Sequence, residues 1–181
     1  MIDLIADTKL ALELEEKGYG FYTGAAQQTE NKLIKAVFQG LAERELIHKN
    51  RITQIYQELT NTKRLPANWL KEAAVTPAKA ALMQPILKLL AEALKNNPAD
   101  KTDQTTTYKI AEELERNSFA LYQKISQETD NPVAKQFYAA LAKEEDEHFA
   151  ILEDTLLYLN NPGDWFKKEE HWIVDGVGAS V

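Results

Sequence analysis

Cysteine is absent from this chain of 181 residues, which excludes several classes of protein. Without thiols the chain cannot form a disulfide, a cysteine-ligated iron–sulfur cluster or a zinc–thiolate module. No run of residues approaches the roughly 18 apolar positions that a membrane-spanning helix needs. The first residues are acidic and lack the basic and apolar regions of a secretory signal. We therefore expect a cytoplasmic protein that does not bind membranes.

Glycine and proline are scarce, at seven and six residues, and they cluster at the ends of segments and in connections. The net charge of −7 argues against a nucleic-acid-binding surface and is compatible with the handling of cations. The length suffices for one domain with a sizeable core, and a second independent core is not expected.

Apolar residues follow the helical period in four segments, at residues 3–28, 31–60, 104–128 and 132–160. Short polar breaks at 29–31 and 129–132 separate the members of each pair, and Pro132 suits a first helical position. Two long helices joined by so short a break must fold back as an antiparallel hairpin. The pattern predicts an all-α four-helix bundle made of two hairpins.

The first hairpin recurs in the second, one hundred positions later. Residues 11–48 and 111–148 align without a gap and share thirteen identities. The chain has three histidines, and two of them occupy equivalent places in a Glu-x-x-His spacing. The identical pairs include Glu15/Glu115, Tyr22/Tyr122, Glu45/Glu145 and His48/His148.

The spacing places these residues at one height of the bundle. Glu15 and Glu45 lie equally far before and after position 30, so at ~1.5 Å rise per residue both sit about 22 Å from the turn. His48 shares a helical face with Glu45, and Tyr22 lies two turns after Glu15. Each hairpin therefore offers two carboxylates and one imidazole, and the second repeats the set.

This set is the ligand inventory of a carboxylate-bridged two-metal site. Four carboxylates held together without cations would repel one another, and two divalent ions would neutralise them. A single Glu-x-x-His on an exposed helix is usually a solvated pair, and a tyrosine facing the bundle is often plain core. Because the motif occurs twice in register, we predict metal ligation, with Tyr22 and Tyr122 assisting catalysis by orienting ligand carboxylates. The predicted ligands are Glu15, Glu45, His48, Glu115, Glu145 and His148.

The remaining segments are interpreted as a crossover between the two hairpins and a C-terminal tail. Residues 1–160 form the bundle, with repeats at 3–60 and 101–160 and a long crossover at 61–100 that holds an extra helix near 79–96. The tail at 161–181, with Trp165 and Trp172, covers an end of the bundle or contacts a second subunit, and His171 is a surface or tail-packing residue. Other acidic residues are expected to face solvent: Glu16, Glu43, Glu144, Asp146 and Glu147.

The motifs resemble those of the rubrerythrin-type branch of the ferritin-like superfamily. They appear as ALELEEKGYGFY with LAERELIH, and again as AEELERNSFALY with LAKEEDEH. The resemblance implies a ferritin-like bundle with a non-haem centre of two iron ions, for which manganese or zinc can substitute. It implies bridging roles for Glu45 and Glu145, and terminal or semi-bridging roles for Glu15 and Glu115.

The chain departs from that family in three respects. Full-length rubrerythrins carry a cysteine-ligated rubredoxin module, so here electrons must come from an external donor. The family's additional glutamate, three residues after the third-helix ligand, is replaced by Ser118, whose equivalent is Gly18. Glu112, one turn before Glu115, is a candidate substitute. Arg44 stands opposite Glu144 in the repeat, which makes the surroundings of the two halves unequal.

The resemblance implies a di-iron redox protein that reduces hydrogen peroxide or dioxygen. One alternative is a ferroxidase or iron-handling protein. Another is a metallated structural or interaction bundle, in which the ions only offset carboxylate repulsion. A homodimer is expected from the resemblance and from the apolar stretch at 86–94.

Overall fold

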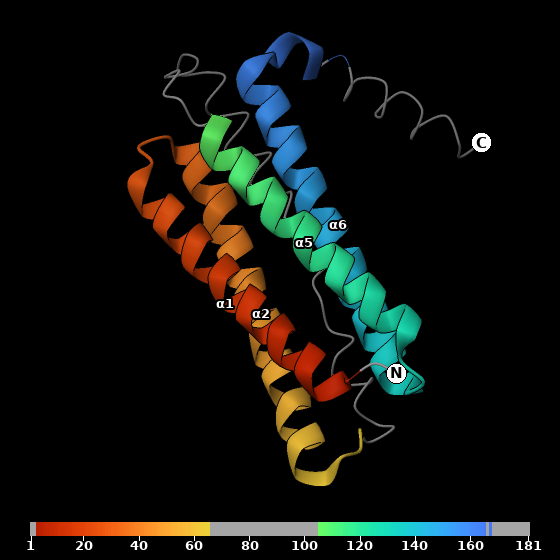
Figure 1. Ribbon diagram of the computed structural model, residues 1–181. Coiled ribbons are helices and arrows are strands. Elements are labelled where there is room, and N and C mark those ends of the chain that lie inside the picture. The colour runs from red at the N-terminus through yellow and green to blue at the C-terminus, as the bar shows by residue number, and fades with distance from the viewer. Residues whose placement is uncertain (1–2, 66–104, 166, 168–181) are drawn as a thin grey trace, which may run out of the picture.

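A computed structural model describes residues 3–65, 105–165 and 167, and it shows a bundle of long helices (Figure 1). They are α1 (Leu4–Gln28), α2 (Lys32–Thr62), α5 (Thr105–Glu128) and α6 (Pro132–Asn160). Each consecutive pair forms an antiparallel hairpin, the two turns lie at opposite ends of the bundle, and α1 packs along α5. The predicted all-α ferritin-like bundle is confirmed. Most of the predicted crossover and most of the tail lie outside the described residues.

The two turns have the same construction. Asn31 caps α2, and its side-chain oxygen accepts from the amides of Leu33 and Ile34 at 3.0 and 3.2 Å. Asn131 caps α6 through the equivalent bonds. The hydroxyl oxygens of Thr29 and Thr129 each accept from the following Asn amide at 3.2 Å. These bonds satisfy donors that a helix start leaves unpaired, and they explain why the breaks need only three residues.

The apolar core consists of two clusters. One contains Phe38, Leu41, Ile151 and Leu152, and its Tyr158 packs edge-on against Trp165 at a centroid distance of 5.5 Å. The other is built around Ile52, Ile55, Ile125 and Phe137. Tyr22 belongs to the first cluster and Tyr122 to the second. Trp165 is therefore buried against the bundle. None of the described helices is long and apolar enough to cross a lipid bilayer.

One buried hydrogen bond differs between the repeats. The Tyr138 hydroxyl donates to the Thr8 hydroxyl at 2.8 Å, and Thr8 in turn donates to the carbonyl of Leu4. At the equivalent positions Phe38 faces Tyr108, with ring centroids 5.2 Å apart. The Tyr108 hydroxyl is buried and has no hydrogen-bond partner in the described part of the chain. Among the described residues, the phenol of Tyr138 therefore has a hydrogen-bond partner and the phenol of Tyr108 has none.

This difference predicts opposite effects of removing the two hydroxyls. Tyr138→Phe is expected to lower the free energy of unfolding by about 1 kcal/mol because a buried hydrogen bond is lost. Tyr108→Phe removes a buried polar group without a partner and is expected to be neutral or stabilising. Chemical denaturation of the metal-free variants measures both values. Equal destabilisation by the two substitutions would contradict the assignment.

Candidate metal centre

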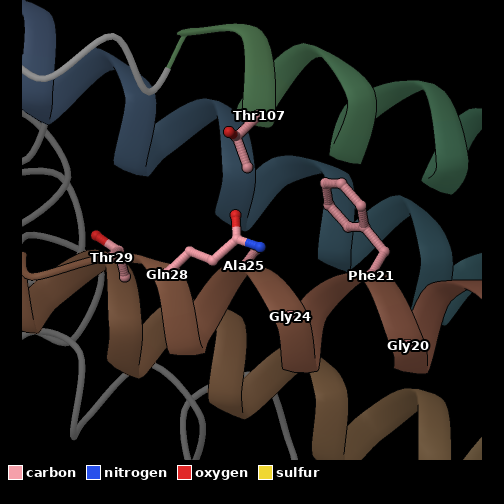
Figure 2. Close-up of a pocket in the computed structure, with 7 residues that line it drawn as sticks. All are labelled: Gly20, Phe21, Gly24, Ala25, Gln28, Thr29 and Thr107. Carbon is pink, nitrogen blue, oxygen red and sulfur yellow. The ribbon is translucent and has the colours of Figure 1, made fainter.

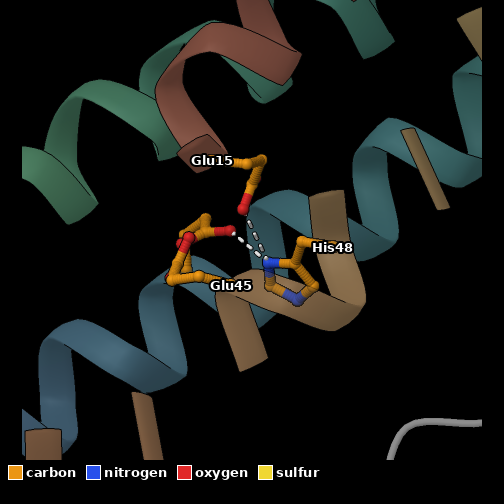
Figure 3. Close-up of side chains that lie close together, drawn as sticks. Glu15, Glu45 and His48 are labelled. Atoms are coloured by element: carbon orange, nitrogen blue, oxygen red, sulfur yellow. Dashed lines mark ion pairs between the residues drawn. The ribbon is translucent and has the colours of Figure 1, made fainter. Parts of the chain in front are cut away.

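The six predicted ligands lie together in the interior of the bundle. Glu15 comes from α1, Glu45 and His48 from α2, and each of the six side chains is at most 3% exposed. Figure 3 shows the Glu15 carboxylate pointing at the His48 imidazole. Such burial is unusual for charged side chains unless they are paired or coordinate an ion. The second repeat contributes its members from α5 and α6: Glu115, Glu145 and His148.

The six residues form two overlapping groups, each able to hold one metal ion. Within each group one ligand atom from every residue lies within 4.8 Å of the others. Glu15 and His48 occur only in the first group, and Glu45 and Glu145 occur in both. The second group is completed by Glu115 and His148. A residue shared by two adjacent sites is where a bridging ligand would lie.

The atoms that converge are left without hydrogen bonds. His48 Nδ1 lies 3.0 Å from Glu145 Oε1 and 3.5 Å from Glu15 Oε2, yet all three atoms are buried and without a hydrogen-bond partner. His148 Nδ1 likewise has no hydrogen-bond partner, although carboxylate oxygens of Glu115 and Glu145 lie 3.3 Å away. Orphaned polar atoms are rare in protein interiors. Oxygen and imidazole nitrogen atoms that face one another in this way suit divalent iron, manganese or zinc.

Two tyrosines cross between the hairpins to fix the outer carboxylates. The Tyr22 hydroxyl on α1 donates to Glu115 on α5, and the Tyr122 hydroxyl on α5 donates to Glu15 on α1. Both phenols are fully buried. Burial, together with the adjacent carboxylates, raises the pKa of both phenols well above 10, so each keeps its proton and acts as a donor. The expected hydrogen bonds are present, and each joins one repeat to the other.

Electrostatics in the metal-free cluster favours protons. Burial raises the pKa of Glu45, reinforced by the other three carboxylates, and raises the pKa of Glu115 to about 8. Burial alone would lower the pKa of both imidazoles, but carboxylates led by Glu15 for His48 and by Glu115 for His148 raise it well above 6.5. Burial also opposes ionisation of Glu145, but the two imidazoles outweigh it and lower its pKa.

Glu144 was expected to face solvent, and the structure corrects this. Its Oε2 lies 2.7 Å from His48 Nε2, on the side of the ring away from the cluster, and its side chain is only 13% exposed. Arg51 Nη1 lies 3.6 Å from its other oxygen. Sequence reasoning missed the contact because it depends on how α6 packs against α2. The signal available was the exchange of Glu144 for Arg44 between otherwise similar motifs.

Gly18 and Ser118, the equivalent positions at which the chain lacks the family's additional glutamate, are buried, whereas Glu112 is partly exposed. Gly18 is buried, and a Cβ atom built on it would lie 2.9 Å from Glu45 Oε2, so the missing side chain makes room for that carboxylate. Ser118 is buried too. Glu112 is partly exposed and belongs to neither metal-binding group. The structure therefore gives no support to Glu112 as a substitute ligand.

A separate open groove of about 440 Å³ lies between the later turns of α1 and the start of α5 (Figure 2). None of its lining residues is charged and none belongs to the cluster, so this groove is not part of the metal centre. It is lined by Gly20, Phe21, Gly24, Ala25, Gln28, Thr29 and Thr107.

Metal uptake is expected to release protons. In the metal-free protein the pKa values of Glu45, Glu115 and both histidines are raised, which favours their protonated forms, whereas metal ligation requires the deprotonated forms. Affinity should therefore rise with pH, about tenfold per pH unit for each proton released. Calorimetric titration with Zn²⁺ in buffers of different ionisation enthalpy counts the protons. Uptake that releases none between about pH 6 and 8 would contradict these pKa directions.

The close approach at Gly18 predicts a second effect. In Gly18→Ala the new methyl group would displace the Glu45 carboxylate, and metal affinity should fall roughly tenfold or more. Gly20→Ala is the matched control, because nothing lies within 4 Å of a Cβ atom there. It should leave affinity unchanged and add about 0.5–1 kcal/mol of stability, as Gly→Ala does inside helices. Equal affinities for the two variants would show that Gly18 is not needed for clearance.

Comparison with known proteins agrees with the geometry. A sequence profile of the Rubrerythrin family matches residues 9–156, which include both hairpins and all six clustered residues. Searches of curated proteins and of solved structures gave no significant match. The family match extends over most of the chain and contains both copies of the motif. The chain therefore belongs to the rubrerythrin family of ferritin-like di-iron proteins.

Proposed function

We propose that this protein is a non-haem di-iron oxidoreductase that reduces hydrogen peroxide or dioxygen with electrons from an external donor. The observation that carries the proposal is the convergence of carboxylate and imidazole atoms without hydrogen bonds in a buried cluster shared by both repeats. The proposed ligands are Glu15, Glu45 and His48 with Glu115, Glu145 and His148. Two ferrous ions held there would supply the two electrons that convert peroxide to water.

The chain's own residues would prepare the site for this reaction. Glu45 and Glu145, which belong to both groups, would hold the two ions at bridging distance. The hydroxyls of Tyr22 and Tyr122 would keep the outer carboxylates in one orientation by donating to them across the bundle. The buried position excludes bulk water, so charge interactions inside the site are strong.

We propose that the electrons come from a separate molecule. With no cysteine anywhere in the sequence, neither a thiolate-bound metal nor a dithiol in this chain can relay electrons. The proposed partner is a reduced electron-transfer protein or small molecule that docks near the bundle. A homodimer remains part of the proposal and rests on the family resemblance and on the apolar sequence at residues 86–94, which lie outside the described part of the chain.

Anaerobic loading with two equivalents of Fe²⁺, followed by stopped-flow mixing with hydrogen peroxide or with dioxygen, tests the function. Stoichiometric appearance of ferric absorbance, faster with peroxide, is the expected result. Faster oxidation by dioxygen, with iron then leaving the protein, would instead support a ferroxidase or iron-handling role. Failure to take up two irons would overturn both.

A pair of variants separates catalysis from a structural role of the metal. Glu45→Ala is expected to bind at most one ion and to lose the rapid oxidation, while Glu43→Ala, which changes an exposed residue on the same helix, should behave as wild type. Thermal unfolding of metal-free protein gives the second readout. If the metal-free wild type is unfolded, the ions act as a structural element, and the proposed catalytic function loses its main support.

A further inference from the structure

The two imidazoles of the cluster differ on the side that faces away from the metal-binding groups. His48 Nε2 lies 2.7 Å from Glu144 Oε2. His148 Nε2 is buried and has no hydrogen-bond partner among the residues that the structure describes. In both rings Nδ1 is the atom that faces the clustered carboxylates. The inner surroundings of the two histidines are therefore alike and their outer surroundings are not.

The cause lies in one exchange within the repeat. Arg44 occupies, in the first repeat, the position that Glu144 has in the second, and it is only 4% exposed. An arginine side chain has donors only, so at that position it cannot accept a proton from an imidazole. Arg51 also lies near Glu144, and the residue equivalent to Arg51 in the second repeat is the apolar Ile151. Among the described residues, a carboxylate thus supports the outer nitrogen of His48 and none supports that of His148.

This difference matters once a metal is bound at Nδ1. The neutral imidazole then carries its proton on Nε2, and the other ring nitrogen needs an acceptor. A carboxylate that accepts this proton fixes the tautomer and ring orientation and makes the imidazole a stronger ligand. Glu144 supplies such an acceptor to His48. In the described part of the chain, His148 would bind metal with a buried N–H group that has none.

We propose that Glu144 is a positioning residue that makes the two metal positions unequal, so that the position on His48 fills first and binds its ion more tightly. This inference rests on the proposed function, because it assumes that the six clustered residues hold two ions. It goes further by assigning an order of filling and by naming the residue that sets it.

Titration of the metal-free protein with Zn²⁺ alone tests the order. In protein with ¹⁵N-labelled histidine, the ring signals of His48 should shift with the first equivalent and those of His148 with the second. His171→Gln removes the third histidine signal and assists assignment. Simultaneous shifts of both rings, or a first shift at His148, would overturn the proposal.

Two divalent ions repel each other in any such centre, so separated binding steps in the wild type are not sufficient, and variants are needed. Glu144→Gln keeps the size and an acceptor oxygen but removes the charge, and it should weaken the first step by roughly 10- to 100-fold with little change in the second. Glu147→Gln is the matched control, with the same chemical change on the same helix and no hydrogen bond or ion pair to a histidine ring recorded in the structure. It should leave both constants near those of the wild type.

A gain-of-function variant completes the test. Arg44→Glu places an acceptor at the position equivalent to Glu144 and should tighten the second step. Thermal unfolding of each metal-free variant shows whether it has folded. Two-ion uptake with identical constants in wild type and Glu144→Gln would overturn this inference and leave the proposed function intact. Absence of zinc uptake by the wild type would overturn the proposed function, and this inference with it.

Discussion

Repulsion among four carboxylates buried at one level of the bundle is the constraint on which the rest of the structure depends. Protons offset it in the metal-free protein, because the pKa values of Glu45, Glu115 and both imidazoles are raised. Two divalent cations would offset the same four negative charges with neutral imidazoles. Proton binding and metal binding are therefore alternatives at one cluster. The bundle surrounds this cluster with packed apolar residues. This surrounding strengthens both the repulsion among the carboxylates and their attraction to protons or cations.

The interactions around the four carboxylates are complete only when the two hairpins pack together. The spacing from Glu15 to Tyr22 is repeated from Glu115 to Tyr122, and antiparallel packing of α1 against α5 places each phenol on the carboxylate of the other helix. Glu45 and Glu145 are likewise shared by the two metal-binding groups. Neither hairpin holds a complete set of interactions alone. Formation of the complete site therefore requires docking of the two hairpins.

Much of this arrangement could be predicted from the sequence because it depends on local spacing. The helical period, the Thr-x-Asn breaks and the equal distances of Glu15 and Glu45 from the turn are properties of one hairpin, and they fixed which side chains lie level with one another. The partner of each tyrosine and the contact of Glu144 with His48 depend on how the hairpins dock, which the spacing does not encode. Glu144 also stands in a run of acidic residues, where composition alone suggests a solvated face.

Ser118, which stands where the family resemblance places an additional glutamate, and its equivalent Gly18 limit how the cluster can rearrange. At Gly18 even a methyl group would meet the Glu45 carboxylate, so the first repeat has no room for a longer side chain without displacing a clustered residue. At Ser118 the side chain is buried and carries no acid. Among the described residues, Glu112 stands outside both groups, so no further carboxylate is positioned to exchange with one that is present. Tyr22 and Tyr122 restrain Glu115 and Glu15, which leaves Glu45 and Glu145 as the carboxylates free of such a bond. Among the four carboxylates, the shared pair is therefore the one that no tyrosine restrains, and the clearance at Gly18 limits how far Glu45 can move.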